Sequence, residues 1–370
     1  MTGFWRVAVS TAVVSAHAAL AEPSPAADER ARRLLDDAVL ASASERPSDP
    51  SQDPSARFHV ALEAAPRWAP ALFDYAVALD RMGKLEEAEA AYRAAAVADD
   101  FPDLRFEAAA RAASIAFDRG NAVGARSAVE LARAALPEDA APFVLQSRVA
   151  LALHDVTTAQ AAARAALMRD SNDADALCAL ARVHLTQRSA GTAKILAARA
   201  ARAAPDEAEP LILQAEIARA MGEPAAELVA ARAAVEADDE SASAALVLGR
   251  ALFERGLGDE ALEQLARAAQ LGPESATNRL ALGMVLAARG ERALAEAQLV
   301  LAARLAPGWP ETHLELARLR EAEGDAKAAL AEAKVFLRLS SGAPVDHPVH
   351  ALVQRCEDAL KTRTQASVVQ

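Results

Sequence analysis

The sequence predicts an all-α protein built as a solenoid, in which repeated pairs of helices stack on one another. The first observation is a regular spacing of 34 residues between glycines, at Gly222, Gly256, Gly290 and Gly324. The second is that prolines keep the same period, seventeen residues away from the glycines, at Pro205, Pro273 and Pro307. A period of this length is typical of helix-turn-helix repeats, each of which is too small to bury its own apolar face.

Composition is the third observation. Hydrophobic residues make up 53% of the 370 positions, but most of them are alanine, and aromatic residues reach only 4%. β-Branched residues are sparse after the first fifteen positions, so helix is the expected state throughout. Because a repeat array grows by addition, the length of the chain counts repeats rather than separate globular domains.

The charge balance limits the class of partner. The chain has 40 Lys and Arg against 52 Asp and Glu, a formal net charge of −12. Such an acidic chain lacks the overall basic surface that contacts the phosphates of nucleic acids. We therefore expect no nucleic-acid partner, although local basic stripes are compatible with this charge.

Residues 1–21 resemble a secretory signal peptide. Arg6 precedes an apolar run from Val7 to Leu20, and Ala19-Leu20-Ala21 has the small residues of a cleavage site. The apolar run is shorter than the roughly 20 residues that span a bilayer as a helix. We expect an exported protein, periplasmic or secreted. The alternative is an uncleaved segment that anchors the chain, which would then be its only contact with a membrane.

The next segment, 22–54, is predicted to hold a helix over about 28–44, followed by a loop rich in Pro, Ser and Asp from Pro47 to Pro54. The repeats fill 55–343, with a degenerate first unit and then eight full ones. The full units start at Ala69, Phe106, Ala140, Ala174, Ala208, Ala242, Ala276 and Pro310. The step from the first to the second is three residues longer than the others.

Each recurring residue has a mechanical reason. Glycine at position 15 ends the first helix because the turn there needs a positive φ. Small residues at positions 8, 20 and 27 let two helix backbones approach closely, while Leu at 7 and 24 fills the space between them. His154 and Arg188 replace the turn glycine and Glu227 replaces the small residue at position 20, so the pattern is weaker in the middle units.

The segment 344–370 is predicted to be a capping helix with a loose tail, because the last repeat of an array needs a cover with a polar outer side. The helix is expected over Pro348–Lys361, with four residues on its buried face: Ala351, Leu352, Cys356 and Leu360. Cys178 and Cys356 are the only cysteines, and they lie five repeats apart. We expect two free, largely buried thiols.

These residues resemble the tetratricopeptide repeat (TPR) family over about 55–343. The match is best in the unit that starts at Ala242, which has Leu248-Gly249, Gly256, Ala261, Leu265, Ala268 and Pro273 at the family's positions. No unit has the family's Trp at position 4. The resemblance implies a right-handed superhelix whose concave groove is lined by the first helix of each pair, chiefly at positions 2, 5, 9 and 12.

The candidate binding site is this groove. Position 9 carries arginine in four of eight units, at Arg148, Arg182, Arg250 and Arg318, and we call these four residues the arginine ladder. Apolar groove residues beside it are Phe73, Phe117, Leu151, Leu185, Ile212, Leu246 and Phe253. Arginine binds carboxylates bidentately, so the groove suits an acidic protein or peptide segment. Alternatively, the ladder only pairs with neighbouring acids such as Glu216, Glu254 and Glu321 on a solvated face.

No catalytic motif occurs, and we expect neither an enzyme nor a bound metal or cofactor. His347 and His350 share a helix face, but zinc needs at least three protein ligands, so an N-terminal capping segment fits them better. The predicted function is a non-catalytic scaffold or adaptor for proteins of the cell envelope. The resemblance and composition point to bacterial envelope assemblies. The alternative is a polysaccharide-binding or export-machinery scaffold, which the shortage of aromatic residues disfavours. The identity of the partner and the oligomeric state stay open.

Overall fold

The computed structural model describes residues 29–44, 55–98, 101–340, 344 and 346–368. The predicted signal peptide at 1–21 and the Pro-rich loop at 47–54 therefore lie outside the described residues. The described part is helical throughout and contains no β-strand, which confirms the all-α prediction. No described helix is long and apolar enough to cross a bilayer.

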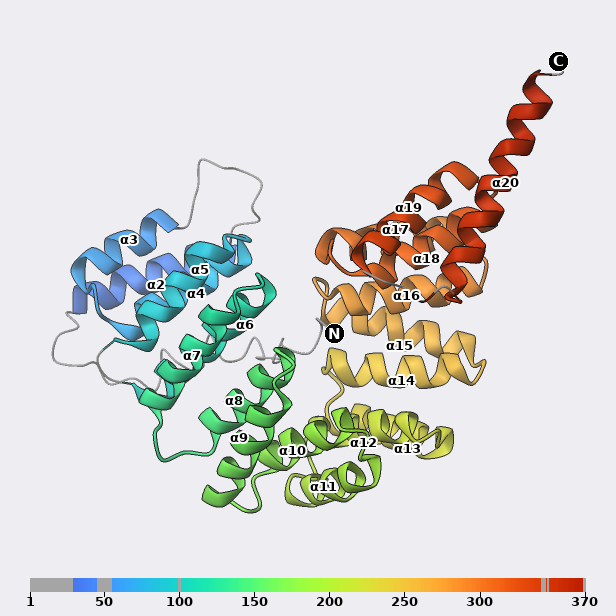
Figure 1. The fold of residues 1–370 in the computed structure, drawn as a ribbon. Coiled ribbons are helices and arrows are strands. Elements are labelled where there is room, and N and C mark those ends of the chain that lie inside the picture. The colour runs from blue at the N-terminus through green and yellow to red at the C-terminus, as the bar shows by residue number, and fades with distance from the viewer. Residues whose placement is uncertain (1–28, 45–54, 99–100, 341–343, 345, 369–370) are drawn as a thin grey trace. The chain divides into compact units, whose positions relative to one another are not determined.

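The chain divides into two compact units, residues 1–204 and 205–370. The helices of the first unit are α2 (Glu29–Ser44), α3 (Ser55–Ala64), α4 (Ala69–Arg81), α5 (Leu85–Ala96), α6 (Pro102–Asp118), α7 (Ala122–Ala135), α8 (Ala141–Ala152), α9 (Val156–Arg169), α10 (Ala174–Thr186) and α11 (Ala190–Ala203). Those of the second are α12 (Ala208–Ala220), α13 (Pro224–Ala237), α14 (Ala242–Glu254), α15 (Gly258–Leu271), α16 (Ala276–Ala288), α17 (Arg292–Leu305), α18 (Pro310–Ala322), α19 (Ala326–Leu339) and α20 (Pro348–Val368) (Figure 1).

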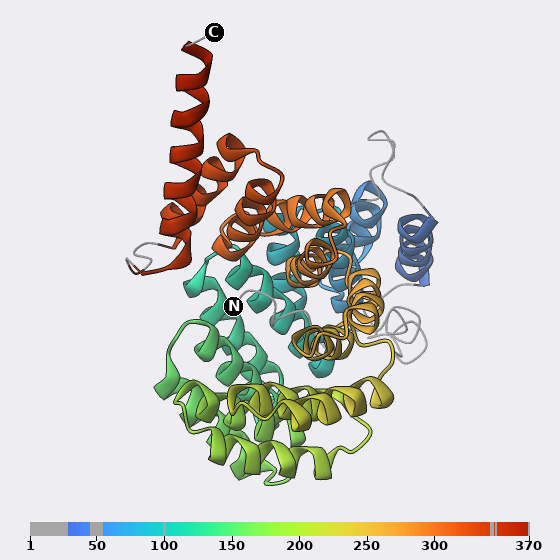
Figure 2. The same cartoon turned by 90° about the vertical axis from the view of Figure 1, so that its right-hand side faces the viewer.

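Within each unit, helices pack only on near neighbours in the chain. Every helix packs on the next, and the first helix of a repeat also packs on the first helix of the following repeat, as in α8 with α10 and α12 with α14. Among the described helices, no extensive contact joins elements more than two apart in sequence. Such nearest-neighbour packing defines an α-solenoid and confirms the predicted architecture (Figures 1 and 2).

The turn inside each repeat has a left-handed residue. Six glycines, at intervals that follow the repeat, have φ between 69° and 81°. His154 and Arg188 take the same conformation, with φ of 61° and 59°, although a side chain there is strained. Helix pairing therefore holds the turn in these two units without glycine. Phe101 is a third such residue, with φ of 56°, and it precedes α6 in the longer connection.

Close helix approach depends on the small residues at position 8. A Cβ built on Gly249 would lie 2.6 Å from Cγ of Leu265, and one on Gly283 would lie 2.7 Å from Cγ of Leu299. Leu265 and Leu299 are fully buried. Each leucine thus fills the space opposite a glycine, which has no side chain. The two helices of a repeat interlock in this way.

The C-terminal helix α20 packs on α18 and α19 and covers the last repeat, as predicted. Leu352 and Cys356 are buried, but Ala351 is exposed, and Val349 is buried instead. The helix continues to Val368, beyond the predicted end at Lys361. Its C-terminal part extends past the other helices of the second unit in both views (Figures 1 and 2).

The two cysteines have the predicted state. Cys178 and Cys356 are both free and buried, with about 1% of each residue exposed. Burial raises the pKa of the Cys356 thiol, and the charge of Glu321 raises it further. A thiol held neutral in this way is a poor nucleophile, so Cys356 acts as a packing residue.

Candidate partner-binding site

The structure places the four arginines of the ladder on α8, α10, α14 and α18, and Arg148 and Arg318 have ion pairs within the chain. Arg148 donates to Asp175 of the next repeat at 2.7 Å, and Arg318 donates to Glu315 of its own helix at 2.6 Å. Arg182 is partly buried. The alternative interpretation, in which the ladder pairs with neighbouring acids, therefore holds for Arg148 and Arg318.

Arg250 differs from these two. Its side chain is partly buried on α14, and among the described residues it has neither a hydrogen bond nor an ion pair. The pairing of Arg148 explains why. Asp175 lies 27 residues after Arg148, at position 2 of the next repeat, and the residue 27 positions after Arg250 is the neutral Thr277. The acid that would pair with Arg250 is therefore missing from the following repeat.

A second arginine accompanies it. Arg219 lies at the end of α12, which packs on α14, and it is exposed with no ion pair among the described residues. Burial lowers the pKa of the Arg250 guanidinium below its ordinary value, and the like charge of Arg219 lowers it further. The guanidinium of Arg250 nevertheless stays cationic, because arginine is not deprotonated in proteins. We call Arg219 and Arg250 the arginine pair.

Three carboxylates lie within electrostatic range of Arg250, in the order of effect Glu254, Glu216 and Glu227. Glu227 is only 4% exposed, in the first turn of α13. Burial raises the pKa of its carboxyl, the charge of Glu254 raises it further, and the arginine pair opposes both. The surroundings of the arginine pair are therefore mixed in charge, with no carboxylate at ion-pair distance from Arg250.

The predicted apolar groove residues fall into two groups. Phe73 and Ile212 are buried in the core, and the ring of Phe73 meets the ring of Tyr92 edge-on at 5.4 Å. The others are partly buried, at Phe117, Leu151, Leu185, Leu246 and Phe253. In the second unit, Leu246 and Phe253 lie on the same face of α14 as Arg250, because they are separated from it by four and three residues. This face offers partly exposed apolar surface beside the arginine pair.

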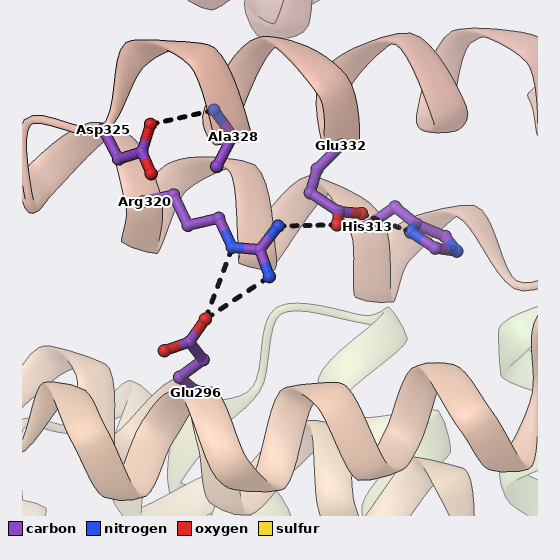
Figure 3. A network of polar contacts seen from close by, with 6 residues as sticks. All are labelled: Glu296, His313, Arg320, Asp325, Ala328 and Glu332. Atoms are coloured by element: carbon purple, nitrogen blue, oxygen red, sulfur yellow. Dashed lines mark hydrogen bonds and ion pairs between the residues drawn. The ribbon is translucent and has the colours of Figure 1, made fainter.

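A polar network that the sequence analysis did not predict joins the last three repeat helices (Figure 3). Glu332 of α19 accepts from Arg320 at 2.8 Å and contacts Nδ1 of His313 at 2.7 Å. Arg320 also reaches Glu296 of α17, at 3.3 Å. These contacts tie α17, α18 and α19 together.

In the described part of the chain, His347 and His350 have no third metal-ligating side chain with them. The described residues contain no group of three or more His, Cys, Asp and Glu side chains that could hold a metal ion. The ring of His347 stacks on Phe336 at 5.1 Å, and its Nδ1 accepts from the backbone N–H of Val349 at 3.2 Å. This confirms that His347 belongs to an N-terminal capping segment of α20.

The fold is similar to those of known proteins, although the sequence is not. No protein-family model matches the sequence, and no curated protein sequence is significantly similar to it. Among solved structures, the Cut9–Hcn1 hetero-tetramer of APC/C is similar with a TM-score of 0.59 and 12% identity, over 89% of this chain and 64% of that one. The chain thus spans less than two thirds of that relative.

Two TPR proteins of bacteria are also similar. One from Parabacteroides merdae gives a TM-score of 0.47 and 14% identity, over 68% of this chain and 98% of that one. TTC0263 from Thermus thermophilus gives a TM-score of 0.42 and 26% identity, over 50% of this chain and 98% of that one. The protein is an α-solenoid of helix pairs. Its fold is that of the tetratricopeptide repeat proteins.

Proposed function

We propose that the protein is a non-catalytic scaffold of the cell envelope, and that its second unit binds a partner segment which carries a carboxylate. One observation carries the proposal: Arg250 is a partly buried guanidinium without an ion pair, beside a second unpaired arginine. A charged group that has lost water without gaining a partner raises the free energy of the unbound protein. A carboxylate from a partner supplies the missing bidentate hydrogen bonds.

The surroundings specify the segment further. Leu246 and Phe253 offer apolar contact on either side of Arg250 along α14, so apolar residues should flank the carboxylate. The carboxylates of Glu216, Glu227 and Glu254 nearby repel a run of acids. The best ligand is therefore a single Asp or Glu, or a chain-terminal carboxylate, in an apolar context rather than a polyacidic tail.

The envelope location is supported by residues 1–21, which have the pattern of a signal peptide. The solenoid fold supports the role of scaffold, because stacked helix pairs present extended surfaces for other chains. The polysaccharide alternative needs aromatic platforms. Trp309 is partly buried against the core of the second unit, and Nε1 of Trp68 is buried, so neither indole is freely presented to a sugar ring.

Titration with labelled peptides tests the proposal. A peptide with one Asp between apolar residues should bind the full chain, and the same peptide with Asn should bind about tenfold or more weakly, since a charged hydrogen bond contributes about 1.5 to 3 kcal/mol. Arg250→Gln and Arg219→Gln should each remove most of that difference. Arg318→Gln is the matched control, because Arg318 already pairs with Glu315. Equal affinity for the Asp and Asn peptides, or an oligosaccharide that binds more tightly than either, would reject it.

A further inference from the structure

The outer sides of α9 and α11, in the first unit, differ from those of all other second helices of the described repeats. The helices α5, α7, α13, α15, α17 and α19 each contain at least one Asp or Glu, whereas α9 and α11 contain none. Together they contribute two arginines from α9, and two arginines and one lysine from α11. A basic surface is thus concentrated on two helices of a chain whose net charge is −12.

The exposed residues of these two helices form a defined face. The buried stripe of α9 is made of alanines alone, at Ala159, Ala162, Ala163 and Ala166, and α11 has the equivalent stripe of three alanines and Leu196. Opposite these stripes lie Arg164 and Met168 on α9, and Ile195 and Arg202 on α11. Lys194 and Arg199 flank them on α11. We call Arg164, Met168, Lys194, Ile195, Arg199 and Arg202 the outer basic face.

A hydrogen bond brings the two helices together. The guanidinium of Arg199 donates to the backbone carbonyl of Ser171 at 3.2 Å, and Ser171 follows the end of α9. The turn that follows α9 therefore lies within reach of the Arg199 side chain of α11. Arg164 and Arg202 have no ion pair among the described residues. Acids lie in the turns that follow both helices: Asp170 and Asp173 after α9 accept from backbone N–H groups, and Asp206 and Glu207 follow α11.

Two large apolar side chains on this face are exposed. Met168 is 86% exposed and Ile195 is 66% exposed, each beside a cationic side chain. Basic residues interspersed with exposed apolar ones are typical of surfaces that lie on anionic membranes, where the cations meet headgroup phosphates and the apolar side chains enter the interface. We propose that the outer basic face binds an anionic lipid surface.

A second copy of the chain is the competing occupant, and part of the acidic charge that it could offer is already used within the chain. On the outer sides of the other repeats, several acids are already paired: Glu86 and Glu89 with Arg119, Asp259 with Arg289, and Glu260 with Arg232. A lipid surface also requires no cavity for binding. The proposal extends the sequence-based expectation, which placed membrane contact only in residues 1–21.

Sedimentation of the full chain with vesicles tests the inference. The protein should bind vesicles of phosphatidylglycerol and not those of phosphatidylcholine, and binding should weaken with salt. Arg164→Gln combined with Arg202→Gln should weaken partitioning roughly 25-fold, since each basic residue near such a surface contributes about fivefold. Met168→Ser combined with Ile195→Ser should weaken it too, through lost insertion.

The matched control is Arg232→Gln combined with Arg304→Gln, which removes the same charge from α13 and α17 and should leave binding unchanged. Equal binding to both lipids would overturn the inference, as would equal losses in the two double arginine variants. Binding to an acidic protein or an oligonucleotide without binding to vesicles would also overturn it. Because the vesicle test uses no partner peptide, its result is independent of the arginine pair on α12 and α14.

Discussion

The interlocking of Gly249 with Leu265 provides a quantitative test of the repeat packing. Leu265→Ala removes a fully buried side chain between α14 and α15 and should cost about 2 to 5 kcal/mol of local stability. Gly249→Ala adds a Cβ that would lie 2.6 Å from Cγ of Leu265. That overlap should cost about 1 to 3 kcal/mol, offset by about 1 kcal/mol from the better helix propensity of alanine.

The double variant tests whether Gly249 and Leu265 are in direct contact. In Gly249→Ala with Leu265→Ala, the new methyl group enters the space that the leucine vacates, so the overlap disappears and the cavity shrinks. The double variant should be about 1 to 3 kcal/mol more stable than the sum of the two single changes predicts. Native-state hydrogen exchange of the amides in α14 and α15 measures this local free energy in the full chain.

The matched control pairs Gly249→Ala with Leu299→Ala. Leu299 faces Gly283 in the following repeat and does not face Gly249, so these two losses should add to within about 0.5 kcal/mol. If Gly249→Ala and Leu265→Ala were also additive, or if the cost of Leu265→Ala were too small to measure, the packing described for α14 and α15 would be wrong.

Three further predictions concern strained or buried groups. His154→Gly and Arg188→Gly should each raise the free energy of unfolding by about 1 kcal/mol in urea, because glycine adopts the positive φ without strain; a loss of stability would contradict the account of these turns. Burial raises the pKa of the Tyr92 hydroxyl, so the folded state keeps its proton while the unfolded state releases it above about pH 10. Stability should therefore fall with rising pH in that range and fall less in Tyr92→Phe; identical pH curves of thermal unfolding would refute it. Burial likewise raises the pKa of the Glu227 carboxyl, so Glu227→Gln should stabilise the protein at pH 7 and the gain should vanish below about pH 4, where both states are protonated. A gain of the same size at both pH values would indicate another cause.

The sequence predicted the helix pairs because their signals are local and repeat. Ala69, Ala174, Ala208, Ala242, Ala276 and Pro310 begin helices as predicted. The three-residue insertion shifted the start of α6 to Pro102, four residues before the predicted start at Phe106. At His154 and Arg188 no glycine marks the turn, but the 34-residue period still predicts its position. Packing of the flanking helices fixes the backbone there.

The candidate site was less accessible to sequence reasoning. Position 9 identified the arginine ladder, but only the position-2 residue of the next repeat separates the paired Arg148 from the unpaired Arg250. Arg219 was missed because it lies at position 12, outside the column that carries the ladder. Phe73 and Ile212 occupy groove positions in sequence yet are buried, since the exposure of a column depends on how closely adjacent repeats pack. The outer basic face could not be found from the groove columns, because it lies on second helices and those columns belong to first helices.

Site-directed photocrosslinking in cells that produce the protein is the most direct test of carboxylate binding at the arginine pair. A photoreactive residue in place of Leu246 lies on the face of α14 that carries Arg250, and one in place of the exposed Val229 of α13 serves as the control. The account predicts that position 246 captures a partner segment containing an Asp, a Glu or a terminal carboxylate, and that Arg219→Gln with Arg250→Gln abolishes the capture. Capture at position 246 that persists in this double variant, or capture that is equal at both positions, would contradict it.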